Sequence, residues 1–264
     1  MSVTPQHFAQ IEGLRLHFRL RGEGPPLLML HGWGTHSLSF GTASLALEKR
    51  FKTMLPDLPG FGFSEMPPNA WGAADYARAI ATLLEQTGFG PCSVLGHSFG
   101  GLVATALATA RPDLVSRLVL VASPVVRLPV APGVRARNRS YVMLRKIAGL
   151  LPPLRERILE WARMRYGSED YRNAGPMRPT IVRVLSENWR DALPSVKAPV
   201  LLIYGENDQD VPLAVANAAM EALPPRAELA VMAGAGHFPF LDDTDAFVET
   251  VSRFLLPAGV RADG

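Results

Sequence analysis

The chain has 264 residues, of which 48% are hydrophobic, and a formal net charge of +3 at pH 7. This size and composition exclude a disordered chain and suit one large domain with a buried core. No apolar stretch approaches the roughly 18 residues of a membrane span. Residues 1–10 show no basic leader followed by an apolar segment, so we expect a cytoplasmic protein without a membrane partner.

Strand-like and helix-like segments alternate along the chain. An edge strand is expected at residues 14–20, and further strands at 27–30, 53–55, 93–95, 118–122, 200–204 and 228–232. Helices are expected at residues 37–49, 73–87, 99–110, 213–223 and 243–255. This alternation predicts an α/β fold with a mostly parallel sheet that is covered by helices on both faces.

The alternation breaks at residues 124–190, where helical patterns and prolines occur without a strand. We therefore expect residues 1–123 and 191–264 to form the core, with residues 124–190 inserted as a helical cap. This segment holds fourteen Lys or Arg, thirteen of them Arg, against five Asp or Glu. Its charge indicates either a solvated basic face or contact with an acidic substrate or carrier. No nucleic-acid partner is expected, because no recognised binding motif accompanies the basic residues.

The segment 93–101 reads Ser-Val-Leu-Gly-His-Ser-Phe-Gly-Gly, a strand that breaks into Gly-x-Ser-x-Gly before an alanine-rich helix. This pattern is typical of a nucleophile elbow with Ser98 at its tip. The turn strains the backbone, and Gly96 and Gly100 leave room across it. The N–H of Phe99 opens the helix and can donate to a negative charge that develops beside Ser98.

A serine hydroxyl needs a base that accepts its proton and a carboxylate that orients the base. The segment 205–212 follows an expected strand and contains Asp208 and Asp210. The segment 233–238 follows the next strand and contains His237 between a glycine and a phenylalanine. Both loops lie at carboxyl ends of strands, where open α/β sheets bind ligands.

Three other features have narrower implications. The loop 31–34, His-Gly-Trp-Gly, follows an expected strand at the place of a second oxyanion donor. The segment 57–64 is rich in glycine, but its spacing fits neither a P-loop nor a dinucleotide fingerprint, so we expect a structural turn. Cys92 is the only cysteine, which excludes an intrachain disulfide, and we expect it to be buried as a small apolar residue.

With Ser98, an acid at 208 or 210 and His237 in this order, the chain resembles α/β-hydrolase-fold serine hydrolases over nearly its whole length. The resemblance implies Ser98 as nucleophile, His237 as general base and Asp208 as orienting acid, with Asp210 as the rival acid. It also implies an oxyanion hole formed by the backbone N–H groups of Trp33 and Phe99, in a loop held by His31. The expected substrate-binding residues are His31, Trp33, His97, Trp161 and Phe238.

The loop 31–34, the segment 57–64 and the basic cap are also similar to those of pimeloyl-acyl-carrier-protein methyl ester esterases. That resemblance implies a cap that binds an acidic carrier, here through Arg135, Arg137, Arg139, Arg145, Arg155 and Arg157. The elbow of that family commonly has Trp where this chain has His97. The same motifs also occur in carboxylesterases and in carbon–carbon bond hydrolases of aromatic degradation.

The sequence therefore predicts a serine hydrolase that cleaves a carboxylic ester through an acyl-enzyme, without a cofactor or metal. The substrate is expected to be a small ester or an acyl group on a carrier. Two alternatives stay open: hydrolysis of a carbon–carbon bond, and a non-catalytic receptor that uses the same pocket. The serine at the elbow argues against dehalogenase or epoxide hydrolase chemistry, for which resembling families use an aspartate.

Overall fold

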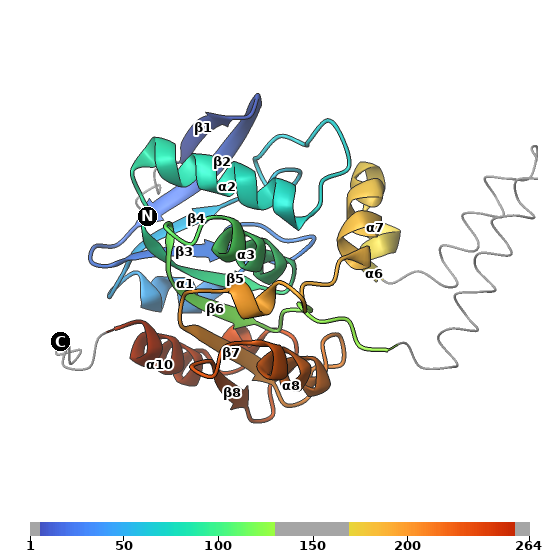
Figure 1. The fold of residues 1–264 in the computed structure, drawn as a ribbon. Coiled ribbons are helices and arrows are strands. Elements are labelled where there is room, and N and C mark those ends of the chain that lie inside the picture. Colours follow the sequence, from blue (N-terminus) through green and yellow to red (C-terminus); the bar gives the residue numbers. More distant parts are fainter. Residues whose placement is uncertain (1–5, 130–168, 257–264) are drawn as a thin grey trace, which may run out of the picture.

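A computed structural model describes residues 6–129 and 169–256 of the chain. Within these residues the strands form a single eight-stranded sheet (Figure 1). Strand β1 pairs antiparallel with β2, and β2 pairs antiparallel with β4. All other neighbouring strands are parallel. This arrangement confirms the expected α/β fold. In spatial order the strands are β1 (His7–Ile11), β2 (Leu14–Arg21), β4 (Lys52–Pro56), β3 (Pro26–Leu30), β5 (Cys92–His97), β6 (Val115–Val121), β7 (Val200–Gly205) and β8 (Glu228–Met232).

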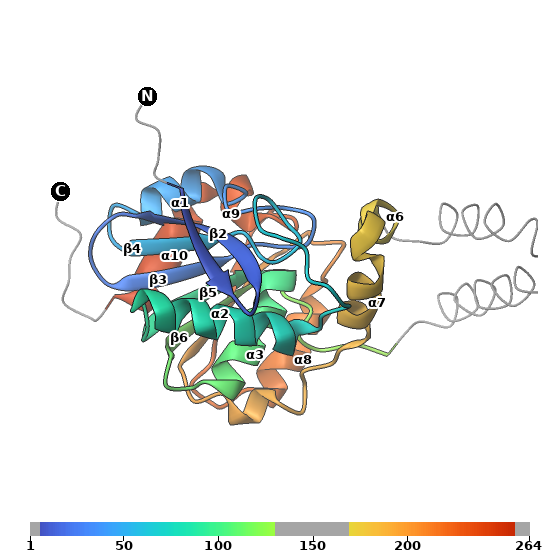
Figure 2. The same ribbon diagram turned by 90° about the horizontal axis from the view of Figure 1, so that it is seen from above.

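Helices cover both faces of the sheet (Figure 2). On one face pack α2 (Ala73–Thr87), α3 (Phe99–Ala110) and α8 (Leu213–Ala222). On the other face pack α1 (Gly41–Leu47), the short α9 (Pro239–Asp242) and α10 (Thr244–Leu255). Successive residues of β3 alternate between the two cores: Leu28 and Leu30 face the first, Leu27 and Met29 the second. The apolar run of this strand is therefore buried from both sides.

Two α-helices belong to the described part of the 124–190 segment, α6 (Glu169–Asn173) and α7 (Arg178–Ser186), with a short 3-10 helix at Gly175–Met177 between them. The end of α7 is fixed to the start of α2. Glu187 accepts the N–H of Ala73 at 2.9 Å, and Arg183 pairs with Asp75 at 3.2 Å. No strand occurs in the described residues of the segment, in agreement with the prediction. The division into core and cap stays a prediction.

Two sequence predictions about the N-terminal part are wrong. The strand at 14–20 is not an edge strand, because β1 pairs with β2 on its outer side. The helix expected at 37–49 is reduced to α1, which begins at Gly41. The preceding residues form a turn, in which the N–H of Ser37 bonds to the carboxylate of Asp57 at 2.6 Å instead of entering a helix.

Cys92 is completely buried at the start of β5, as expected, and burial raises the pKa of its thiol to about 12. Among the described helices, none has both the length and the apolar character needed to cross a bilayer.

Candidate active site

Ser98 occupies a strained turn between β5 and α3. Its φ of 50° and ψ of −113° lie in a region that residues other than glycine rarely adopt. The N–H of Ser98 donates to the carbonyl of Val121 on β6 at 2.8 Å, which fixes the turn against the sheet. A Cβ on Gly96 would overlap the carbonyl of Gly100, and one on Gly100 would overlap the carbonyl of Leu30. The two glycines are therefore required by close packing.

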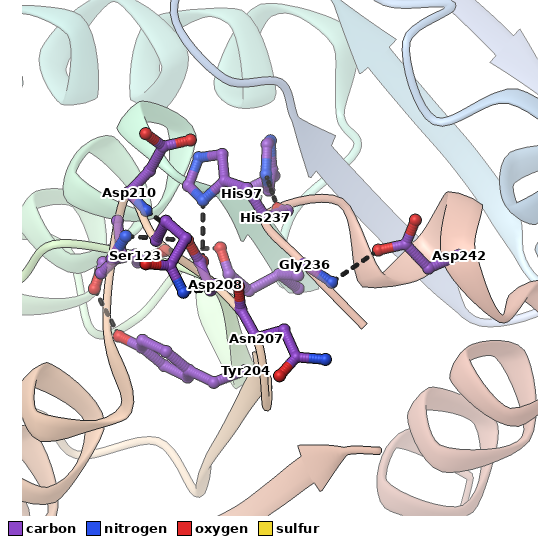
Figure 3. A network of polar contacts seen from close by, with 12 residues as sticks. His97, Ser123, Tyr204, Asn207, Asp208, Asp210, Gly236, His237 and Asp242 are labelled. Atoms are coloured by element: carbon purple, nitrogen blue, oxygen red, sulfur yellow. Dashed lines mark hydrogen bonds and ion pairs between the residues drawn. The ribbon is translucent and has the colours of Figure 1, made fainter. Parts of the chain in front are cut away.

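His237, after β8, meets Asp208, after β7 (Figure 3). The Nδ1 atom of His237 lies 2.8 Å from Oδ2 of Asp208. The other carboxylate oxygen accepts the N–H groups of Asp210 and Val211, both at 2.8 Å. Asp208 is 4% exposed, whereas Asp210 is exposed to solvent. Of the two candidate acids, the structure brings Asp208 to the histidine.

The contacts of Asp208 determine its charge. Burial opposes ionisation, but the bond from His237 and the amides of Val211 and Asp210 outweigh burial and hold the pKa of Asp208 below its usual value. An anionic Asp208 accepts a hydrogen bond from the Nδ1–H of a neutral His237, which leaves Nε2 without a proton and able to accept one.

The two loops that carry this pair pack directly on each other. The N–H of Asn207 donates to the carbonyl of Ala235 at 2.8 Å and joins the two loops. Within the histidine loop, the N–H of Gly236 donates to the Asp242 carboxylate at 2.8 Å. A Cβ on Gly205 would overlap the carbonyl oxygens of Ala235 and Gly236. Glycine at the end of β7 therefore permits the approach of the two loops.

His31 holds the loop that carries Trp33. The Nε2 atom of His31 accepts the N–H of Leu58 at 2.9 Å, so its proton lies on Nδ1, 2.8 Å from the carbonyl oxygen of Gly32. Complete burial lowers the pKa of His31 to about 4, which keeps the ring neutral. The hydroxyl of Thr35 donates to the same oxygen at 2.9 Å. Because this carbonyl and the N–H of Trp33 belong to one planar peptide, both donors fix the direction of that N–H.

Thr35→Val is expected to lower kcat by about 5- to 20-fold with little change in KM, because it removes one of the two donors that orient the Trp33 amide. Thr35→Ser keeps a hydroxyl and should stay within about 2-fold of the wild type. Steady-state kinetics of both variants check this prediction. Equal values of kcat for the two variants would contradict it.

Asp57 connects the Trp33 loop to the segment 57–64. Its carboxylate accepts the N–H of Ser37 at 2.6 Å, the N–H of Phe63 at 2.9 Å and a bond from His17 at 2.8 Å. Burial opposes its ionisation, but these donors outweigh burial and hold the pKa of Asp57 below its usual value. These contacts agree with the structural role predicted for the segment.

A cavity of about 300 Å³ opens at Ser98. Trp33 and Phe99 form part of its wall and pack edge-on, with ring centroids 5.4 Å apart. The rest of the wall comes largely from α7 and from residues that follow β6. The lining residues are Trp33, Ser98, Phe99, Leu102, Pro124, Val126, Arg127, Leu128, Asp170, Ile181, Val184, Leu185 and Glu187.

Of the expected substrate-binding residues in the described part of the chain, Trp33 lies on the cavity wall and the others do not. His31 is 0% and His97 2% exposed, and neither lines the cavity. The ring nitrogens of both histidines instead form hydrogen bonds with backbone groups of the protein. Phe238 packs edge-on against His237, with ring centroids 5.3 Å apart. The substrate contacts themselves stay a prediction. Trp161 and the predicted carrier-binding residues Arg135, Arg137, Arg139, Arg145, Arg155 and Arg157 lie outside the described residues.

Sequence reasoning missed the α7 wall of the cavity. Ile181, Val184 and Leu185 have the i, i+3, i+4 spacing of one helix face, and this spacing is visible in the sequence. The spacing does not reveal that this face of α7 lines the same cavity as Ser98.

One group of three potential metal ligands occurs in the described residues: Asp208, Asp210 and His237, whose ligand atoms lie within 4.8 Å of one another. Both oxygens of Asp208 already accept hydrogen bonds, and one of these comes from the histidine. The donor set therefore fits a carboxylate that orients an imidazole better than a metal site.

The free energy of unfolding is expected to fall as pH decreases from about 6.5 to 4. Burial lowers the pKa of His31 to about 4, and burial with the nearby His237 lowers that of His97 to about 3. Unfolded histidines protonate near pH 6.5, so unfolding takes up protons in this range. The stability they contribute is complete above that pH and decreases below it by about 1.4 kcal/mol per pH unit for each histidine. Urea unfolding at several pH values measures the slope, which should be smaller in His97→Gln; an unchanged slope would contradict the expectation.

The chain is similar to several known proteins. A model described as the alpha/beta hydrolase family matches residues 27–250. A pimeloyl-[acyl-carrier protein] methyl ester esterase of Chromobacterium violaceum is 32% identical over 256 residues, covering 92% of this chain and 98% of that protein. A 2-hydroxymuconate semialdehyde hydrolase of Pseudomonas sp. strain CF600 is 29% identical over 270 residues, covering 95% and 93%. The crystal structure of a hydrolase from Pseudomonas aeruginosa gives a TM-score of 0.75 at 21% identity, covering 97% of this chain and 100% of that chain.

Proposed function

The chain belongs to the alpha/beta hydrolase family, and from this premise we propose that it is a serine hydrolase that cleaves a carboxylic ester through an acyl-enzyme. One observation carries the proposal: a buried Asp208 bonds to Nδ1 of His237, in a loop hydrogen-bonded to the elbow residue next to Ser98. With Ser98 as the nucleophile, this arrangement supports His237 as the base and Asp208 as the acid that orients it.

In the proposed acylation step, Nε2 of His237 removes the proton from Ser98 Oγ as this oxygen attacks the ester carbonyl. Asp208 stabilises the imidazolium that forms. The carbonyl oxygen becomes an anion, and the N–H groups of Phe99 and Trp33 donate to it. When the tetrahedral intermediate collapses, His237 returns the proton to the leaving alcohol, and the acyl group stays on Ser98.

In the second step His237 removes a proton from water, which attacks the acyl carbonyl. The acid is released and the proton returns to Ser98. The apolar residues of the cavity, among them Leu102, Val126 and Ile181, suit an alkyl or aryl acyl group.

We further propose that the acyl group is presented on an acidic carrier. The excess of arginine at residues 124–190 and the similarity to a carrier-protein esterase support this proposal. Some of these arginines already pair within the protein: Arg183 with Asp75 and Arg190 with Glu221. The six predicted carrier-binding arginines are the residues to test.

Carbon–carbon bond hydrolysis is the second candidate, because a relative of similar length carries the name of a semialdehyde hydrolase. The same serine, histidine and oxyanion donors are available to either reaction. The substrate that is turned over fastest distinguishes the two candidates.

A substrate panel tests the proposal. It contains p-nitrophenyl esters from acetyl to decanoyl, methyl esters of acyl carrier protein and a vinylogous diketone. We expect turnover of esters that depends on Ser98. A variant with the six arginines replaced by Gln should be impaired only on the carrier ester if the carrier proposal is correct. Turnover of the diketone alone would favour carbon–carbon hydrolysis, and ligand binding without any turnover would favour a receptor.

A further inference from the structure

His97 is a buried imidazole where three segments of the proposed site meet. It precedes Ser98 directly in the chain and is 2% exposed. Its Nε2 atom lies 2.9 Å from the main-chain carbonyl oxygen of His237 (Figure 3). A Cβ built on Gly32, beside the proposed oxyanion donor, would lie 2.8 Å from its Nδ1 atom. One side chain thus contacts the nucleophile turn, the base loop and the oxyanion loop.

The hydrogen bond defines the tautomer of His97. A carbonyl oxygen only accepts, so Nε2 must carry the proton and donate it, and Nδ1 is left without one in the neutral ring. Burial and the nearby His237 lower the pKa of His97 to about 3. The ring therefore stays neutral, with the proton on Nε2, at any pH at which the protein is expected to work.

Aromatic packing holds the ring in place. Its centroid lies 5.0 Å from that of His237, 5.0 Å from that of Phe238 and 4.9 Å from that of Phe240. Phe240 is completely buried and also packs on Phe40 and Phe247, so the contacts of His97 extend into the core between the sheet and α10. A ring held from several sides has little freedom to leave its hydrogen bond.

We infer that His97 is a positioning residue: its Nε2–H holds the backbone of His237 and so sets the distance between the base and Ser98. A misplacement of about 1 Å can cost about 10²-fold in rate, so one buried bond of this kind has a large effect on turnover. The inference rests on the proposed function. It assigns His97 no contact with substrate and no proton transfer.

Two substitutions separate the hydrogen bond from the packing. His97→Phe keeps a ring but removes the donor, whereas His97→Gln loses the ring but keeps an N–H at a similar reach. We expect His97→Phe to lower kcat by about 10- to 100-fold with KM within about 3-fold of the wild type. His97→Gln should retain kcat within about 5-fold. The rate at which a fluorophosphonate labels Ser98 should change in parallel with kcat.

His7 provides the matched control, because it lies on β1 at the outer edge of the sheet and stacks on Phe18. His7→Phe and His7→Gln should leave kcat unchanged. Circular dichroism confirms that each variant is folded. A folded His97→Phe with the kcat of the wild type would overturn the inference, as would equal losses in the Phe and Gln variants.

Nitrogen-15 NMR of the wild type tests the inference independently of activity. We expect the neutral Nε2–H tautomer for His97 between pH 5 and 8, and the Nδ1–H tautomer would overturn the inference. If the wild type shows the expected tautomer but no Ser98-dependent turnover, the proposed function fails while the hydrogen bond of His97 stands. If His97→Phe fails to fold, this NMR result and the kcat of His97→Gln decide the inference.

Discussion

Ser98→Ala is expected to lower kcat on any ester that the wild type hydrolyses by about 10⁴- to 10⁶-fold, because no acyl-enzyme can form without the hydroxyl. The turn itself should survive, since the N–H of Ser98 that bonds to Val121 belongs to the backbone. Alanine, like serine, has a Cβ and meets no additional contact. Steady-state turnover with p-nitrophenyl acetate or a longer ester measures the loss.

Binding serves as the control for this substitution. The Ala variant should bind the product acid as tightly as the wild type, because the cavity wall is unchanged apart from one oxygen. Calorimetric titration measures both proteins. Turnover retained in a folded Ser98→Ala protein would contradict the account, and loss of binding together with turnover would show that the substitution damages the cavity.

Asp208→Asn is expected to lower kcat by about 10³- to 10⁴-fold. The amide has no charge to stabilise an imidazolium, and it can present N–H groups to Nδ1 of His237, which favours the tautomer with the proton on Nε2. A protonated Nε2 cannot accept a proton from Ser98. The measurement is kcat across pH 6 to 9 on the best ester of the panel.

Asp210→Asn is the matched control, two residues away and with the same change in charge. The side chain of Asp210 is exposed, and the hydrogen bond from Asp210 to the Asp208 carboxylate comes from its backbone N–H. We expect kcat to stay within about 2-fold of the wild type. A large loss in Asp210→Asn with little loss in Asp208→Asn would exchange the roles of the two acids.

The strand and helix positions were largely predictable because most of the sheet is parallel and buried on both sides. Such strands read as short apolar runs, and the strand expected at 200–204 corresponds to the fully buried β7 (Val200–Gly205). The helix α2 has the expected bounds. The first strand, β1, is short and lies at the sheet edge, where its burial pattern is mixed. Because the sequence pattern does not predict β1, it predicts that the strand at 14–20 lies at the edge of the sheet. The start of α1 depended on the carboxylate of Asp57, which no local pattern reveals.

The candidate site, too, is predictable from the sequence where its residues lie close together in the chain, and not where they lie far apart. The elbow, the histidine loop and the acid loop are recognisable because each motif lies within a few residues. The bond between His97 and His237 joins residues 140 positions apart, and that between His17 and Asp57 joins residues 40 apart. Whether a histidine lines the cavity or supports a loop depends on such contacts, so the sequence alone cannot show that His31 and His97 lie away from the cavity wall.

The charge composition of a segment likewise does not predict what each charged side chain contacts. The excess of arginine at residues 124–190 is a property of the sequence, but the structure shows that individual arginines differ in use. Arg183 helps to fix α7 to α2, and Arg190 pairs with Glu221. Arg127 lines the cavity and donates to the carbonyl of Ser186 at 3.1 Å.

Intact-mass spectrometry after treatment with a fluorophosphonate, followed by peptide mapping, tests the central claim most directly. We expect one adduct per chain, on Ser98, that is absent in Ser98→Ala and forms much more slowly in Asp208→Asn. A wild-type protein that hydrolyses esters but carries no adduct, or carries it on another residue, would contradict the assignment of Ser98 as nucleophile.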